Sequence, residues 1–130
     1  MMNEDQVRRF LDRYGQAISE ANLAGIARCW DVPALVLSDL GAIAVSSRDE
    51  VERFLGQAQE SYRSQGLVAT QPALEQVEAL SEKLTSVHVR WSTLDRAGVE
   101  KASERSSYIL RLGDDGEPRI QVALTRSMQD

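Results

Sequence analysis

Three oxygen-bearing side chains have the type and spacing to hold or transform a small molecule: Tyr14, Glu104 and Tyr108. Glu104, Ser106 and Tyr108 alternate along one stretch, so they share one face of a predicted strand. A carboxylate in an apolar pocket has a raised pKa and can act as a general acid or base. Hydroxyl groups can hold a polar group of a ligand. The alternatives are a solvated rim position for Glu104 and core positions for both tyrosines.

Asp39 is the other candidate base, and it follows Ser38 in an apolar stretch that breaks at Asp39-Leu40-Gly41. Strand parity sends Ser38 and Asp39 to opposite faces, so the register decides which of them meets a pocket. Arg126 could pair with a buried carboxylate or an anionic ligand, or lie outward in solvent. The other candidate lining residues are aromatic and are first of all core residues: Trp30, Phe54, Tyr62 and Trp91.

Metal and cofactor chemistry find little support in the sequence. His88 is the only histidine, which excludes sites with two histidine ligands, and its alternation with Val87 and Val89 places it on an outer face. Cys29 is the only cysteine and lies beside an apolar stripe, which favours inert packing. We expect neither a metal nor a cofactor.

The last third of the chain, from residue 84 to 128, positions most of these candidates. It predicts three long antiparallel strands joined by turns at 95–98 and 113–116. In the first strand Val87, Val89 and Trp91 fall on one face. In the last, Ile120, Val122 and Leu124 are predicted to point inward. Three strands with one apolar face need helices to cover it.

The first half of the chain supplies those helices. Apolar spacing predicts a helix over 4–21 with Asn3 as its cap, a shorter one from Leu23 to Trp30, and a third over 47–66. The third helix is predicted to bury a stripe at Val51, Phe54, Leu55, Ala58 and Tyr62. Residues 34–45 predict a short hairpin, and residues 67–80 fit a strand or a helix, with the strand favoured.

Composition and charge argue against two classes of partner, nucleic acids and membranes. The 130 residues predict one domain over 1–130, and a net charge of −5 with a pI near 4.9 argues against nucleic acid. No apolar run is long enough to span a membrane, and the N-terminus lacks the apolar core of a secretion signal. We therefore expect a cytoplasmic protein with no membrane partner.

The order of elements resembles the nuclear transport factor 2-like superfamily, which includes SnoaL-like polyketide cyclases and ketosteroid isomerase. The resemblance covers nearly the whole chain and is carried by 7-VRRFLDRYGQAISEANLAGIARCWDVPALVLSDLG-41 and 108-YILRLGDDGEPRIQV-122. It implies an α+β fold, also called cystatin-like, in which a cone-shaped, curved, mostly antiparallel sheet wraps around three helices. It further implies an apolar pocket inside the cone and a homodimer formed through the outer sheet face, with His88, Arg90, Arg105 and Arg111 exposed there.

Only part of the steroid isomerase site carries over to this sequence. Tyr14 matches that enzyme's oxyanion-binding tyrosine, but Ser38 stands in place of its catalytic aspartate and Tyr108 in place of its protonated aspartic acid. A serine without a partner base cannot abstract a proton near neutral pH. The resemblance therefore implies a binding site rather than the isomerase reaction.

The sequence thus predicts a small-ligand-binding protein whose partner is a small apolar molecule. As an enzyme it would be a cofactor-independent lyase, cyclase or isomerase with Glu104 or Asp39 as its base. Polar anchors would be Tyr14, Ser38 and Tyr108. The alternative is a non-catalytic protein-interaction or dimerisation module.

Overall fold

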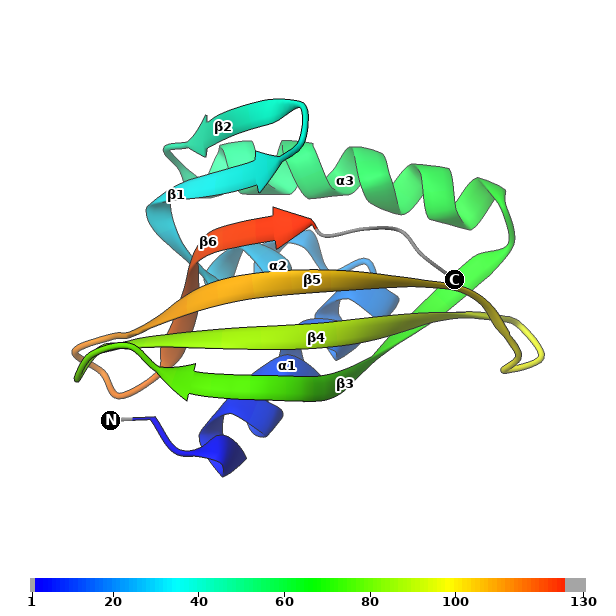
Figure 1. Cartoon of the computed structure of the whole chain (residues 1–130). Coiled ribbons are helices and arrows are strands. Elements are labelled where there is room, and N and C mark those ends of the chain that lie inside the picture. Colours follow the sequence, from blue (N-terminus) through cyan, green and yellow to red (C-terminus); the bar gives the residue numbers. More distant parts are fainter. Residues whose placement is uncertain (1, 126–130) are drawn as a thin grey trace.

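The computed structural model describes residues 2–125, which form three helices and a six-stranded sheet (Figure 1). In chain order the elements are α1 (Glu4–Ser19), α2 (Leu23–Arg28), β1 (Trp30–Ser38), β2 (Gly41–Val45), α3 (Arg48–Ser64), β3 (Leu67–Ala79), β4 (Leu84–Asp95), β5 (Glu100–Leu112) and β6 (Pro118–Thr125). The predicted α+β class is confirmed. Within this part of the chain, no helix combines the length and apolar character needed to cross a membrane.

Side-chain caps set where α1 and α3 begin. The Asn3 side chain accepts a hydrogen bond from the Gln6 backbone N–H at 2.8 Å, and the Gln6 side chain accepts one from the Asn3 N–H at 3.1 Å. At α3, Ser47 Oγ accepts from the Glu50 N–H at 3.2 Å. Each cap satisfies an N–H group that has no partner within the helix. Both predicted helix starts are confirmed.

The sheet has the strand order β2-β1-β6-β5-β4-β3, and every neighbouring pair is antiparallel except β1 and β6. Residues 67–79 form β3, the edge strand beside β4, so the strand prediction for this region is confirmed. Register shifts interrupt four of the five pairings. Such bulges bend and twist strands, and the resulting sheet is curved with all three helices on one side (Figure 1).

The core lies between α1 and the middle of this sheet. Val87 and Val89 on β4 are fully buried, and the helix face that meets the sheet includes Phe10 and Tyr14. Gly15 permits the close approach, because a Cβ there would lie 3.2 Å from Trp91 Cζ3 on β4. The predicted alternation of β4 is confirmed.

Trp30 is not helical. The helix α2 ends at Arg28, and Trp30 is the first residue of β1, where it pairs with Ile120 of β6. The Ile120 N–H also donates to the Cys29 carbonyl oxygen at 2.8 Å. The helical spacing predicted Trp30 in the second helix; sheet pairing overrides that local pattern.

One extra residue in β6, Gln121, reverses the predicted facing of the rest of the strand. Pairing between β5 and β6 shifts by one residue at this point, which makes a β-bulge. Beyond it, Ala123 stands opposite the inward-facing Tyr108, whereas Val122 and Leu124 pair with outward-facing residues of β5. The prediction that Val122 and Leu124 point inward is therefore wrong, because the bulge breaks the period of two.

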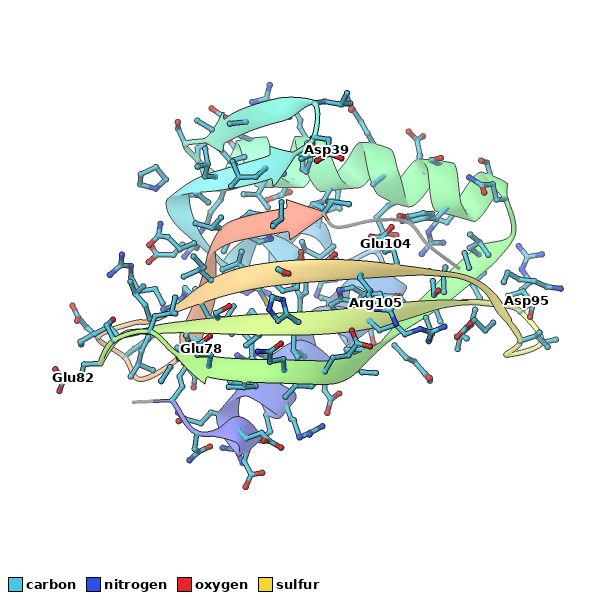
Figure 2. The ribbon with its side chains drawn as sticks, in the orientation of Figure 1. Asp39, Glu78, Glu82, Asp95, Glu104 and Arg105 are labelled. Atoms are coloured by element: carbon cyan, nitrogen blue, oxygen red, sulfur yellow. The ribbon has the colours of Figure 1, made fainter. Side chains whose placement is uncertain are left out.

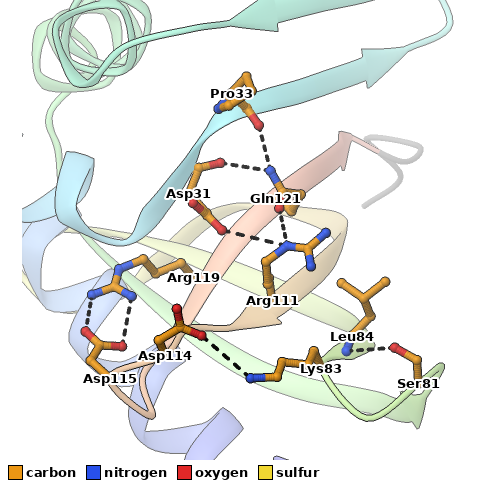
Figure 3. A network of polar contacts seen from close by, with 10 residues as sticks. All are labelled: Asp31, Pro33, Ser81, Lys83, Leu84, Arg111, Asp114, Asp115, Arg119 and Gln121. Atoms are coloured by element: carbon orange, nitrogen blue, oxygen red, sulfur yellow. Dashed lines mark hydrogen bonds and ion pairs between the residues drawn. The ribbon is translucent and has the colours of Figure 1, made fainter.

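The Gln121 side chain also repairs a gap between β6 and β1. The β1 strand pairs with β6 at Trp30 and resumes only at Leu35. Between these points Gln121 Nε2 donates to the carbonyl oxygens of Asp31 at 3.1 Å and Pro33 at 2.6 Å, and Gln121 Oε1 accepts from Arg111 (Figure 3). One side chain thus replaces ladder bonds that the backbone cannot make here.

The apolar stripe of α3 is less buried than its spacing predicted. Of α3, Val51 alone is buried among the described residues, and Phe54 remains 38 % exposed. Leu55, Ala58 and Tyr62 are half-buried. The stripe faces a space between α3 and the sheet rather than the sheet itself, so the prediction of a buried stripe is corrected.

Candidate functional site

That space is a cavity of about 300 Å³ with an open mouth. Its lining comes from α1, α3 and strands of both halves of the sheet, and much of it is apolar or aromatic. The main contributors are Tyr14, Ile18, Ile26, Trp30, Val36, Phe54, Leu55, Ala58, Gln59, Tyr62, Leu67, Thr70, Trp91, Thr93, Glu104, Ser106, Tyr108 and Ala123. The volume falls at the lower end of the range typical of small-molecule sites.

Every tryptophan and every tyrosine of the chain lines this cavity. Two phenol–indole pairs stand at its inner wall: Trp30 Nε1 donates to the Tyr14 hydroxyl at 3.2 Å, and Trp91 Nε1 donates to the Tyr108 hydroxyl at 2.9 Å. The rings of Tyr14 and Tyr108 meet edge to face, with centroids 6.3 Å apart. Each phenol hydroxyl is thus held by an indole N–H at the cavity wall.

Both phenols stay protonated and so keep a hydrogen to donate. Burial raises the pKa of Tyr14 well above its ordinary value, and the nearby Tyr108 raises it further. Burial raises the pKa of Tyr108 to about 12, against a lowering by the hydrogen bond of Ser106. An indole N–H can only donate, so the Tyr14 oxygen is the acceptor in its pair. Among the described residues, no acceptor meets the Tyr14 hydroxyl proton itself.

Glu104 stands on the same face of β5, nearer the mouth. It pairs across the sheet with Trp91, and it accepts a long hydrogen bond of 3.4 Å from the Tyr62 hydroxyl of α3. Figure 2 shows Glu104 between β5 and α3, whereas the adjacent Arg105 lies on the opposite side of the sheet. Burial raises the pKa of Glu104, and the Tyr62 hydrogen bond lowers it by less.

The structure brings most of the candidate residues together. Eight border the cavity: Tyr14, Trp30, Phe54, Tyr62, Trp91, Glu104, Ser106 and Tyr108. Ser38 and Asp39 do not; Ser38 is exposed and its hydroxyl accepts from the Leu40 N–H at 3.2 Å, and Asp39 lies in the exposed β1–β2 turn (Figure 2). Arg126 lies outside the described residues.

Sequence reasoning missed several polar residues of the lining. Gln59 of α3 is one, and its side chain donates to the Ile18 carbonyl oxygen at 2.7 Å, joining α3 to α1. Gln59 directly follows Ala58, a member of the predicted apolar stripe of this helix, and that position could have identified it as a lining residue. Thr70 and Thr93 form a cross-strand pair whose place depends on the register of β3 and β4.

The remaining titratable candidates lie elsewhere. His88 on the outer face makes a 2.6 Å hydrogen bond between its Nδ1 and Ser107 Oγ. Cys29 is buried, and burial raises the pKa of its thiol despite the nearby Arg13. Within residues 2–125, no three His, Cys, Asp or Glu side chains gather as metal ligands.

Solved structures share this fold over nearly the whole chain. A domain of unknown function with a cystatin-like fold from Nostoc punctiforme PCC 73102 is 17 % identical, with a TM-score of 0.73 over 98 % of this chain and 77 % of that one. An NTF-2-like protein of unknown function from Shewanella oneidensis MR-1 is 14 % identical, with a TM-score of 0.71 over 97 % of this chain and all (100 %) of that one. A ketosteroid isomerase-like protein from Erwinia carotovora atroseptica SCRI1043 is 15 % identical, with a TM-score of 0.70 over 99 % of this chain and 100 % of that one.

At these identities the likeness shows the fold alone, and that fold is of the cystatin-like, NTF2-like class. Residues 3–127 match the family described as NTF2-like protein (DUF6841), and the chain belongs to that family. The resemblance inferred from the sequence is thereby confirmed. None of the curated proteins matches this sequence.

Proposed function

We propose that the chain binds a small, largely apolar molecule in the cavity between α3 and the sheet. The observation that carries the proposal is the half-buried apolar stripe of α3, which faces a cavity instead of packed side chains. Apolar surface left beside an enclosed space favours an apolar occupant, because binding removes that surface from water.

The hydroxyl groups at the inner wall give such a molecule an orientation. Tyr14 has a hydroxyl proton that no described residue accepts, and Tyr108 lies close to it. A ligand with one neutral acceptor, such as a carbonyl oxygen, would accept a hydrogen bond from Tyr14 while its apolar body fills the space below α3. Ser106, buried on the same face, adds a further hydroxyl.

A cofactor-independent lyase, cyclase or isomerase reaction is the catalytic form of this proposal. Glu104 is the one carboxylate among the described lining residues, and its raised pKa suits a general acid or base. Asp39, the other candidate base, lies in the exposed turn, so Glu104 takes this role alone.

Mass spectrometry of the purified protein tests the proposal, first in the native state and then after denaturing extraction. A co-purifying apolar compound, or a thermal shift with members of an apolar ligand panel, supports it. Tyr14→Phe and Glu104→Gln then separate binding from turnover, since loss of a base abolishes turnover without abolishing binding. Protein that carries nothing and shows no thermal shift across the panel refutes the proposal.

A second candidate function, a dimerisation module, follows from the outer sheet face. Cross-strand pairing gathers apolar side chains on this face over β2, β1, β6 and part of β5: Leu35, Leu37, Ala42, Ala44, Ile109, Val122 and Leu124. Leu35 is 36 % exposed and Leu124, which also borders the cavity mouth, is 37 % exposed. We infer that a second copy of the chain covers this apolar area.

Light scattering at several protein concentrations tests that inference. The expected result is a dimer for the unaltered chain and a monomer for Leu35→Lys, because a charge in the centre of an apolar interface is costly to bury. Arg96→Glu, in the β4–β5 turn, is the control surface change. A monomer at all concentrations contradicts the inference.

A further inference from the structure

The cavity lining contains a carboxylate that no nearby cation of the described residues neutralises. Glu104 is its only described acid and Arg63 its only described base. Arg63 is exposed on α3 and forms no ion pair with Glu104 among the described contacts. No cation contributes to the pKa of Glu104, which responds to burial and to Tyr62. A partly buried carboxylate therefore lies in the cavity without a cationic partner among residues 2–125.

Aromatic rings surround this carboxylate on several sides. Trp91 is its cross-strand partner on β4, Tyr108 follows four residues further along β5 on the same face, and Tyr62 approaches from α3. The negative charge of Glu104 also raises the pKa of both tyrosines. The arrangement places one anion beside several aromatic side chains, a side-chain type whose ring faces attract cations.

That combination is complementary to a cation. A carboxylate removed from water is stabilised by an opposite charge with good geometry, and an ammonium group over an aromatic face gains further attraction. A neutral ligand would leave Glu104 uncompensated, and an anionic ligand would be repelled by it.

We propose that the molecule bound in this cavity is a cationic amine, whose ammonium group lies at the mouth between Glu104 and the surrounding rings. Its apolar body fills the space beneath α3. The proposal rests on the proposed function and adds the charge of the ligand to it. In this arrangement Glu104 is a specificity-determining residue, because it discriminates an amine from a neutral molecule of the same shape.

Three probes of one shape and different charge test the proposal: 3-phenylpropylamine, 3-phenylpropan-1-ol and 3-phenylpropanoate. Binding is measured by calorimetry with the full chain at neutral pH and low salt. We expect the amine to bind about 10- to 100-fold more tightly than the alcohol, as one charge-assisted contact allows. We expect the propanoate to bind most weakly.

Two variants assign the preference to its residue. Glu104→Gln should lower the affinity for 3-phenylpropylamine to within about threefold of the alcohol, while the alcohol itself binds as before. Glu100→Gln is the matched control, since it removes the same charge from the same strand outside the cavity lining, where Glu100 pairs with Arg90. Thermal unfolding of each variant shows that it is folded.

The outcomes separate the two proposals. Equal binding of amine and alcohol to the unaltered chain, or tighter binding of the propanoate, overturns the amine proposal and leaves apolar ligand binding standing. A preference for the amine that survives Glu104→Gln also overturns it. Failure of all three probes together with the wider apolar panel refutes both.

Discussion

Removing the Tyr14 hydroxyl isolates one buried hydrogen bond. In Tyr14→Phe, the Trp30 indole N–H loses its acceptor at 3.2 Å, and both side chains are almost fully buried. A buried donor left without a partner costs about 1–3 kcal/mol. Both residues border the cavity, where a water molecule can serve as a substitute acceptor, so we expect the lower part of that range, about 1–2 kcal/mol.

Urea unfolding followed by circular dichroism measures this loss, and each kcal/mol should lower the melting temperature by roughly 3–5 °C for a chain of this size. The double variant Tyr14→Phe with Trp30→Phe should lose less free energy of unfolding than the two single variants lose in sum, because no donor is then left unpaired. Tyr62→Phe is the control, since its hydroxyl makes a single long contact. A fully additive cycle, or a Tyr14→Phe variant as stable as the original, would refute this account of the inner wall.

Three further predictions concern other parts of the molecule. The folded state holds a proton on Glu104 more readily than the unfolded chain, so its contribution to stability is lost as pH rises through the folded pKa. Glu104→Gln should therefore have the same free energy of unfolding as the original chain near or below about pH 4, and a value higher by up to about 1 kcal/mol at pH 7. Melting curves recorded across this range would contradict the prediction if the difference in stability were the same at every pH. Gln121→Ala should lower the free energy of unfolding by about 1–2 kcal/mol, because the carbonyl groups of Asp31 and Pro33 lose their donor, and an unchanged urea midpoint would count against this. Asn3→Ala should lower the free energy of unfolding by about 1 kcal/mol because it removes the α1 cap. Asn3→Asp should keep most of that stability, because an aspartate side chain can also cap the helix.

Much of the fold could be predicted from short-range patterns. The alternation of Val87, Val89 and Trp91 predicted the buried face of β4, and Asn3 predicted the start of α1. These features depend on neighbours within a few residues, so the sequence alone contains their causes. A similar alternation along β5 placed Glu104 and Tyr108 on one face, so part of the candidate cavity could be predicted.

The rest depends on contacts between distant segments. Trp30 continues a helical pattern, yet its pairing with Ile120 of β6 makes it a strand residue. The bulge at Gln121 has no local signature such as a glycine, and the facing of everything after it follows from the register against β5. Ser38 was placed by analogy with an enzyme, and the exposed end of β1 takes it out of the cavity lining.

The bulge in β6 ties two properties of the molecule to a single inserted residue. With strict alternation, branched side chains would stand opposite Tyr108 and its neighbours and occupy space that now belongs to the cavity. The insertion presents the small Ala123 there and sends Val122 and Leu124 to the outer face. Room inside and apolar surface outside thus both follow from the same shift in register. A descendant in which Gln121 took a regular place in the ladder would turn Val122 and Leu124 inward and lose both traits together.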